Sequence, residues 1–170
     1  MSRLPSRVVL VAAACAAQLA LVGVAVAGPL SARLTGDEYL LAVQPVDPVD
    51  PFRGAYVDLG YPTLSGSSEG GFWRPDEVPG ERGAVFVPLV RDGALWRGGE
   101  ATRTRPDSGP YVRCNDAEWR LRCGIESWFL PQDKAIGVER AVASGSAVAR
   151  VRVDARGNAA LVGVEVSPAG

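Results

Sequence analysis

The sequence contains no histidine among its 170 residues, and this absence excludes several kinds of chemistry. Ser-His-Asp and Cys-His catalysis both need an imidazole, as do His-ligated zinc sites and histidine general bases. Any catalysis would have to use carboxylates, tyrosine, serine or a cation bound by oxygen ligands. The residue pattern predicts no cofactor and no metal site.

Lysine and cysteine are almost as scarce. Lys134 is the only lysine, so a Ser-Lys catalytic pair would have to use it. Its Pro-Gln-Asp-Lys context is typical of a loop with a solvated side chain. The three cysteines are too few for a four-cysteine zinc site, because Cys15 lies inside a long apolar run. There it is expected to act as a small apolar residue.

Charge is missing altogether between Arg7 and Arg33. Val8 to Gly28 consists almost entirely of Val, Ala and Leu. A helix of this length would be about 31 Å long, close to the roughly 30 Å hydrocarbon core of a bilayer. The sequence therefore predicts an anchor over residues 8–30 that crosses the lipid bilayer once.

The charges before the anchor predict its orientation. Two arginines and no acidic residue precede it, so we expect residues 1–7 in the cytoplasm and residues 31–170 outside it. The alternative is a signal peptide that is cleaved after Ala27, at Ala25-Val26-Ala27, to release a secreted protein. We favour the anchor, because the apolar run is long for a cleaved signal and Pro29 lies close to the cleavage site.

The part after the anchor has the length of one domain. It carries all 19 acidic residues, while the whole chain has a net charge of −1. Its arginines are scattered rather than clustered, so nothing in the charge pattern indicates nucleic acid as a partner.

Strand patterns dominate this domain. A single short helix is expected from about residue 134 to 144, with Asp133 as its N-cap and Gly145 just past its end. About eight strands and this helix predict a mainly β (α+β) domain of barrel-like or sandwich form. The clearest runs with strand character are residues 38–43, 55–61, 84–87, 94–96, 119–126, 147–153 and 160–166.

Two hairpins are predicted within this pattern. The first turns at Asp92-Gly93, where glycine supplies the positive φ that tight hairpin turns require. The second joins residues 147–153 to 160–166, and on its first arm Arg150 and Arg152 alternate with apolar residues. The strongest alternation runs from Trp119 to Glu126 and predicts a strand with Trp119, Leu121, Cys123 and Ile125 on one face.

Cys114 and Cys123 are the two cysteines outside the anchor. In an oxidising compartment a pair at this spacing predicts a disulfide, with residues 115–118 forming the turn between them. The alternatives are a redox-active pair or two buried thiols. We favour the structural disulfide, because a redox-active pair usually has the form Cys-x-x-Cys.

The string from Gly54 to Tyr61 resembles the signature of the GDYXXLXY family. Gly54, Tyr56, Leu59 and Tyr61 match that signature, while Ala55 replaces its aspartate. The resemblance extends over residues 34–166.

A second string, Ile125 to Gln132, is similar to a Glu-x-Tyr-Phe-x-Pro-Glu pattern of the same family. Trp128 replaces the tyrosine and Gln132 replaces the last glutamate, while Glu139 matches a later one. The family comprises bacterial membrane-anchored proteins without an assigned activity, some of them encoded beside multi-spanning membrane proteins. The resemblance therefore implies a location, a fold and a possible class of partner, but no reaction.

The polar residues in and around these strings are the candidate ligand-binding residues. If they converge, they would form a carboxylate cluster for a cation or polar ligand, with the one arginine as a bidentate partner for an anion. The alternative, which we favour, is that they pair and cap locally to hold turns. These candidates are Asp47, Asp50, Arg53, Glu126 and Glu139.

Two functions remain open at this point. The first is a non-catalytic module that docks on another envelope protein, for which the resemblance suggests a multi-spanning membrane protein. The second is a membrane-anchored hydrolase that uses carboxylates or a pair formed by Ser127 and Lys134. We favour the first, and whether the protein is an enzyme stays undecided from the sequence.

Overall fold

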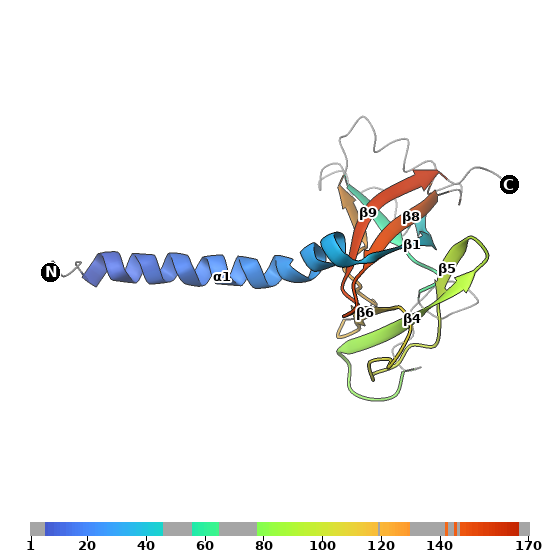
Figure 1. The fold of residues 1–170 in the computed structure, drawn as a ribbon, viewed down its shortest axis with the longest axis horizontal. Helices are drawn as coiled ribbons and strands as arrows, with labels where there is room; N and C mark the ends of the chain where they lie inside the picture. The colour runs from blue at the N-terminus through green and yellow to red at the C-terminus, as the bar shows by residue number, and fades with distance from the viewer. Residues whose placement is uncertain are drawn as a thin grey trace.

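The computed structural model describes residues 6–45, 56–64, 78–118, 120–129, 142, 145 and 147–166. It contains one long helix, α1 (Ser6–Thr35), which leads directly into a β domain. Figure 1 shows α1 projecting away from this domain, while its C-terminal end contacts the strands. From Arg7 to Thr35 the helix is long and apolar enough to span a membrane, and none of its most apolar window is buried within the protein.

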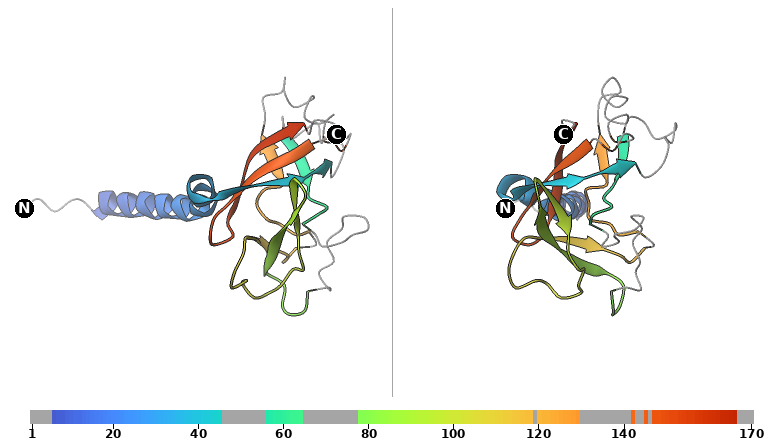
Figure 2. Two further views of the ribbon diagram at one scale, coloured as in Figure 1. Left: turned by 45° about the vertical axis from the view of Figure 1, so that its right-hand side comes forward. Right: turned by 90° about the vertical axis from the view of Figure 1, so that its right-hand side faces the viewer.

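The described part of the β domain has nine strands in two sheets (Figure 2). Their bounds are β1 Asp37–Ala42, β2 Gln44–Pro45, β3 Tyr56–Gly60, β4 Ala84–Asp92, β5 Leu95–Gly98, β6 Tyr111–Asn115, β7 Ser127–Phe129, β8 Ala147–Val153 and β9 Ala159–Val166. The larger sheet has the order β6-β4-β5-β1-β8-β9, and the smaller one has the order β2-β3-β7. The mainly β class is thus confirmed, as an open six-stranded sheet with a smaller sheet rather than a closed barrel.

Both predicted hairpins are present. Strands β4 and β5 pair antiparallel up to Asp92 and Leu95, and Gly93 in the turn has φ of 62°. Strands β8 and β9 pair antiparallel along their length. On β8 the residues at odd-numbered positions are buried, while Arg150 and Arg152 lie on the more exposed face, so the predicted alternation is confirmed.

The hydrophobic core draws on both sheets. Leu41 from β1 and Val151 from β8 are completely buried in the larger sheet, and Leu59 from β3 is almost completely buried in the smaller one. Ile125, just before β7, is completely buried as well. Because these residues belong to one cluster, the two sheets share a single core.

The segment from residue 120 to 126 is not the strand that its alternating pattern predicted. Its described residues make one isolated bridge, between Asn115 and Arg122, and regular pairing starts only at β7. Gly124 adopts φ of 80°, which is incompatible with an extended strand. The Glu126 carboxylate also accepts hydrogen bonds from the backbone N–H groups of Cys123 and Gly124, which curls the segment into a turn.

The predicted disulfide between Cys114 and Cys123 is present. Its two Cα atoms lie 4.1 Å apart, and the two cysteines directly follow the bridged pair Asn115 and Arg122 as the next facing pair. The bond therefore closes the loop that follows β6. Cys15 is a free, exposed cysteine on α1.

The predicted short helix lies almost wholly outside the described residues. Within it, Val142 is buried and its carbonyl accepts a hydrogen bond from the N–H of Gly145, at 3.1 Å. The helix itself stays a prediction.

Helix α1 joins the β domain without a linker, since only Gly36 separates it from β1. Gly36 donates its N–H to the carbonyl of Ala32 at 2.9 Å, and its own carbonyl accepts from Arg152 Nε at 2.9 Å. Arg152 also donates to the carbonyl of Arg33. These bonds attach the end of the helix to β8.

A second set of contacts attaches the helix to the β8–β9 turn. Ser31 Oγ donates to Asp154 Oδ2 at 2.6 Å, and Arg33 Nη2 donates to the carbonyl of Leu161 at 3.2 Å. Ala32 is completely buried between these two bonds. We call the contacts of residues 31–36 with residues 152–161 the anchor junction.

The anchor junction predicts a strict requirement for glycine at position 36. A Cβ there would lie 2.5 Å from the carbonyl oxygen of Ala32 and 2.8 Å from backbone atoms of Val153. Neither backbone can yield without breaking the junction, so Gly36→Ala should lower the free energy of unfolding by about 1–3 kcal/mol. Thermal unfolding of the purified full chain measures this change, with Gly23→Ala as the control because a Cβ at Gly23 meets no atom within 4 Å.

Candidate functional site

The structure describes only one of the five predicted ligand-binding residues. Asp47, Asp50, Arg53 and Glu139 lie outside the described residues, so their convergence on a ligand stays a prediction. Glu126 is half-buried at the start of β7. Its carboxylate binds the two backbone N–H groups of the preceding turn, as the local capping alternative expects for this residue.

The two family-like strings lie side by side. Strand β3 comes from the first string and β7 from the second, and they pair antiparallel with Val57 opposite Trp128. Beyond the paired residues, the N–H of Leu59 donates to the carbonyl of Glu126 at 2.7 Å. The signature residues thus build one small sheet.

Tyr61 adds a side-chain hydrogen bond between the two strings. Its hydroxyl donates to the carbonyl of Ile125 at 2.8 Å, just before β7. Burial, with a smaller effect from the nearby Glu126 carboxylate, raises the pKa of Tyr61 well above its usual value. A tyrosine in this state stays protonated and acts as a hydrogen-bond donor, which indicates a structural role for this signature residue.

A groove lies where α1 leaves the β domain, next to β7. Its volume is about 270 Å³, and we call it the anchor groove. Phe129 on its rim is 76% exposed, which is unusual for a large apolar side chain. The groove is lined by Pro29 and Arg33 of α1, by Gly124, Ser127, Trp128 and Phe129, and by Ala160 and Leu161 of β9.

The residues proposed for a hydrolase do not meet in the described structure. Ser127 is exposed on β7, and Lys134 lies outside the described residues. No group of three or more His, Cys, Asp or Glu side chains within the described ranges could hold a metal ion. The hydrolase alternative therefore stays an untested prediction, with no contact in its support.

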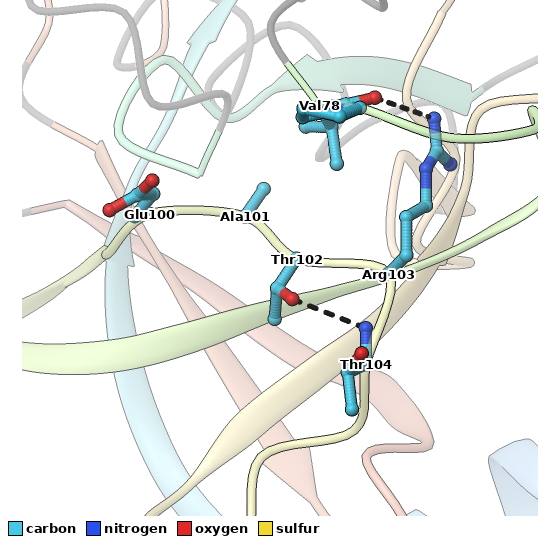
Figure 3. Close-up of a pocket in the computed structure, with 7 residues that line it drawn as sticks. Val78, Glu100, Ala101, Thr102, Arg103 and Thr104 are labelled. Carbon is cyan, nitrogen blue, oxygen red and sulfur yellow. Dashed lines mark hydrogen bonds between the residues drawn. The ribbon is translucent and has the colours of Figure 1, made fainter.

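A second, larger hollow of about 460 Å³ lies beside the loop that follows β5. Figure 3 shows Val78, Glu100, Thr102 and Arg103 along its edge, with Arg103 Nη2 donating to the carbonyl of Val78 at 3.4 Å. In the same view Thr102 accepts a hydrogen bond from the N–H of Thr104, at 3.2 Å.

Arg103, one of the two charged residues of this hollow, is already engaged in an ion pair with a buried carboxylate. Arg103 donates from Nη1 and Nη2 to the two carboxylate oxygens of Asp116, at 2.7 and 2.8 Å. Asp116 is completely buried and also accepts from the N–H of Gly83 at 2.8 Å. The hydrogen bonds from Arg103 lower the pKa of Asp116 against the effect of burial, and the pair ties the loop after β5 to the end of β6.

Asp154 in the β8–β9 turn is a second buried carboxylate. Burial alone would raise its pKa, but hydrogen bonds from Ser31 and Asn158 and from the backbone N–H groups of Arg156 and Asn158 bring the pKa below its usual value. Each of the two oxygens accepts two of these bonds, and protonation would turn one oxygen into a donor, so the full set needs the carboxylate form. Asp154 thus holds both the turn and the anchor junction in the ionised state.

The depressed pKa values of Asp116 and Asp154 predict acid lability. Because the unfolded chain takes up protons at a higher pH than the folded one, the stability that these groups contribute is present above about pH 4. It is lost as the pH falls through their folded pKa values. The melting temperature of the full chain should therefore decline below about pH 4.

Asp154→Asn provides the matched variant for this effect. It should be less stable at neutral pH and should lose less stability in acid, because one of the two titrating groups is gone. Circular dichroism melts between pH 7 and pH 2 measure both changes. A melting temperature that rises in acid, or an identical acid response in the variant, would contradict the assignment.

Neither of these two buried carboxylates was predicted from the residue pattern. Arg103 and Asp116 are 13 positions apart, and Ser31 and Asp154 are 123 positions apart, so neither pair follows a helical or strand periodicity. The one local signal was the turn sequence from Asp154 to Asn158. In such turns an aspartate commonly binds backbone N–H groups two residues on.

Comparison with known proteins adds the family. The model of the GDYXXLXY protein family matches residues 18–164, which include most of α1 and all strands except the last residues of β9. No curated protein and no solved structure matches the chain. The match covers most of the sequence and includes both strings that pair in the smaller sheet. The chain therefore belongs to the GDYXXLXY family.

Proposed function

We propose that α1 is an uncleaved membrane anchor and that the β domain is a non-catalytic module outside the cytoplasm that docks on another membrane protein. Exposed apolar residues along α1 support the anchor, among them Leu19 at 73%, Leu21 at 71% and Val24 at 77% exposed. The β domain does not cover them, whereas a bilayer would. The two arginines before the helix favour a cytoplasmic N-terminus.

The observation that carries the docking function is the anchor junction. A domain that searches for soluble substrates can hang on a flexible linker, but here one residue separates helix and strand. Five hydrogen bonds between residues 31–36 and residues 152–161 fix the two parts to each other. The β domain is thereby held at one height and one orientation above the membrane, as docking on a neighbouring membrane protein requires.

The anchor groove is the surface that we propose for docking, because of its position beside α1. It opens beside Pro29 and Arg33, at the level where α1 leaves the apolar segment. Trp128 and Phe129 line it, and tryptophan is enriched at membrane–water interfaces. A protein that lies beside α1 in the membrane would reach this groove first.

Gln18, a polar residue within the apolar segment, also supports a partner in the membrane. Pro29 follows Gln18 by about three helical turns, so both residues lie on one face of α1. An amide in hydrocarbon gains hydrogen bonds when another transmembrane helix packs against it. Gln18 and the anchor groove therefore form one continuous face, which favours a transmembrane helix as the partner.

The family resemblance bears on the kind of protein that packs here. Some members of the family are encoded beside multi-spanning membrane proteins, so we take a helix of such a protein as the partner. A second copy of this chain is the alternative outcome that the test must distinguish.

Photocrosslinking in native membranes tests the proposal. A photoreactive amino acid in place of Gln18 and, separately, of Phe129 should capture the same membrane protein. Two positions serve as controls at which this crosslinked product should not form. Ala20 lies on the opposite face of α1 from Gln18. Leu34 is 70% exposed but does not line the groove. Gln18→Leu should reduce the capture at Phe129.

The same membranes test the anchor separately. The chain should stay in the membrane after an alkaline carbonate wash, because a transmembrane helix inserts effectively irreversibly. A soluble product that begins at Gly28 would show cleavage instead. Capture of a second copy of this chain at both positions, or of different proteins at the two positions, would contradict the docking proposal.

A further inference from the structure

Two exposed arginines that do not line the anchor groove meet at the β8–β9 turn, one from the turn itself and one from the loop between β5 and β6. Arg156 lies in the turn with 69% of its side chain exposed, and its Nη2 donates to Ser31 Oγ at 3.0 Å. Arg105, also exposed, donates from Nη2 to the carbonyl of Ala155 at 3.0 Å. The two guanidinium groups therefore flank the tip of one turn.

The helix places this turn at a defined depth. Ser31 is the first residue after the apolar segment that ends at Leu30, and it contacts both Asp154 and Arg156. In a bilayer the hydrocarbon core of about 30 Å is flanked on each side by about 5–7 Å of head groups. With residues 8–30 in the hydrocarbon, the β8–β9 turn lies among the head groups.

The turn is rigid enough to stay there. Asp154 holds its backbone through the N–H groups of Arg156 and Asn158, at 2.9 and 3.0 Å. Gly157 packs so closely that a Cβ would lie 2.4 Å from the ring of Tyr111. The tip therefore cannot fold away from the membrane without losing these contacts.

The exposed charge at the tip of the turn is positive, because two exposed arginines and one buried carboxylate lie there. The acidic residue of the turn, Asp154, is buried and uses its oxygens for Ser31, Asn158 and the turn backbone. Its Oδ2 also lies 3.8 Å from Nη2 of Arg156, in an ion pair that leaves most of the Arg156 side chain exposed. The side chains of Arg105 and Arg156 are both exposed. Guanidinium groups bind phosphate oxygens in a bidentate manner, which an exposed pair at head-group depth can do.

From this placement we propose that Arg105 and Arg156 bind the phosphates of anionic phospholipid head groups, so that the β8–β9 turn is a lipid contact on the opposite side of α1 from the anchor groove. The inference rests on the proposed insertion of α1. It assigns this turn a lipid partner, whereas the anchor groove has a protein partner.

Spin labels on the full chain in lipid nanodiscs test the inference. One label on native Cys15 reports whether α1 lies in the hydrocarbon. A second label at Ala155→Cys and a third at Glu165→Cys, each in a Cys15→Ala background, report the two ends of the β8–β9 hairpin. The remaining cysteines, Cys114 and Cys123, form the disulfide and do not react.

A small fraction of nickel-chelating lipid is then added. The nickel ion increases the electron spin relaxation rate of labels that lie near the head groups. The label at position 155 should relax several-fold faster than the label at 165, because seven residues of strand separate the two by about 20 Å. The increase in relaxation rate at position 155 should be larger in phosphatidylglycerol bilayers than in phosphatidylcholine bilayers. In Arg105→Glu/Arg156→Glu this lipid dependence should be lost, and in Arg105→Lys/Arg156→Lys much of it should remain.

The three labels distinguish a failure of the proposed membrane insertion from a failure of the proposed lipid contact. If the Cys15 label is accessible to water-soluble nickel, α1 is not inserted and the anchor itself is wrong. If Cys15 is in the hydrocarbon but the labels at 155 and 165 relax equally, the lipid contact is wrong and the anchor stands. Equal relaxation at position 155 in the two lipids would also overturn the binding of anionic head groups.

Discussion

Replacing Asp116 with alanine is expected to lower the free energy of unfolding of the β domain by about 3–5 kcal/mol. The side chain of Asp116 is completely buried, and that of Arg103 is 18% exposed. Without the carboxylate, the guanidinium group of Arg103 and the N–H of Gly83 lose their partner in a mostly dry site. Chemical denaturation of the purified full chain in detergent measures the loss.

Two further variants show whether the buried charge is the cause. Glu118→Ala removes an ion pair with Arg122 on the same loop, but both side chains there are about 60% exposed, so the cost should stay below about 1 kcal/mol. The double variant Asp116→Leu/Arg103→Met removes both charges together and should recover much of the stability. A small loss in Asp116→Ala, or no recovery in the double variant, would contradict this account.

Removing the disulfide is expected to cost about 2–3 kcal/mol, the entropy of closing a loop of this length. The bond links Cys114 on β6 to Cys123 in the turn before β7, and this turn leads into the smaller sheet. We expect Cys114→Ala/Cys123→Ala to lower the denaturation midpoint, and a reductant to have the same effect on the wild type.

Cys15→Ala is the matched control for this experiment, because Cys15 is free and lies on α1. It should leave both the midpoint and its response to reductant unchanged. If the double variant kept the wild-type midpoint, the bond would not stabilise the domain. If mass mapping of protein from its native compartment found both thiols free, the pair would not be a structural disulfide.

The parts of the fold that could be predicted are those whose signal is local. Asp92-Gly93 identifies its hairpin because glycine alone supplies φ of 62° without strain. The alternation around Arg150 and Arg152 identifies β8 because one face of that strand is buried. Both signals act within a few residues, and the pairing of these strands with their neighbours agrees with them.

The segment from 120 to 126 shows where local reasoning failed. Its alternation was the clearest in the sequence, yet the turn at Gly124, the disulfide and the capping by Glu126 impose an irregular path. Ile125 is buried as predicted, so the burial of that face was partly right while the backbone conformation was wrong.

The candidate site could be predicted only in part. The strings that define the family pointed to the correct region, but not to their pairing as β3 and β7. The anchor groove joins α1 to segments about 100 and 130 positions away, and no sequence period reports such contacts. Four of the five candidate residues lie outside the described structure, so their role in binding is still a prediction.

The central claim is that α1 and the β domain form one rigid unit, joined at Gly36. The most direct test is a distance distribution between spin labels on native Cys15 and on Glu165→Cys, recorded for the full chain in nanodiscs. The account predicts a single narrow distance, which three glycines inserted after Gly36 should broaden. A distribution that is already broad in the uninterrupted chain would show a flexible tether and would contradict the account.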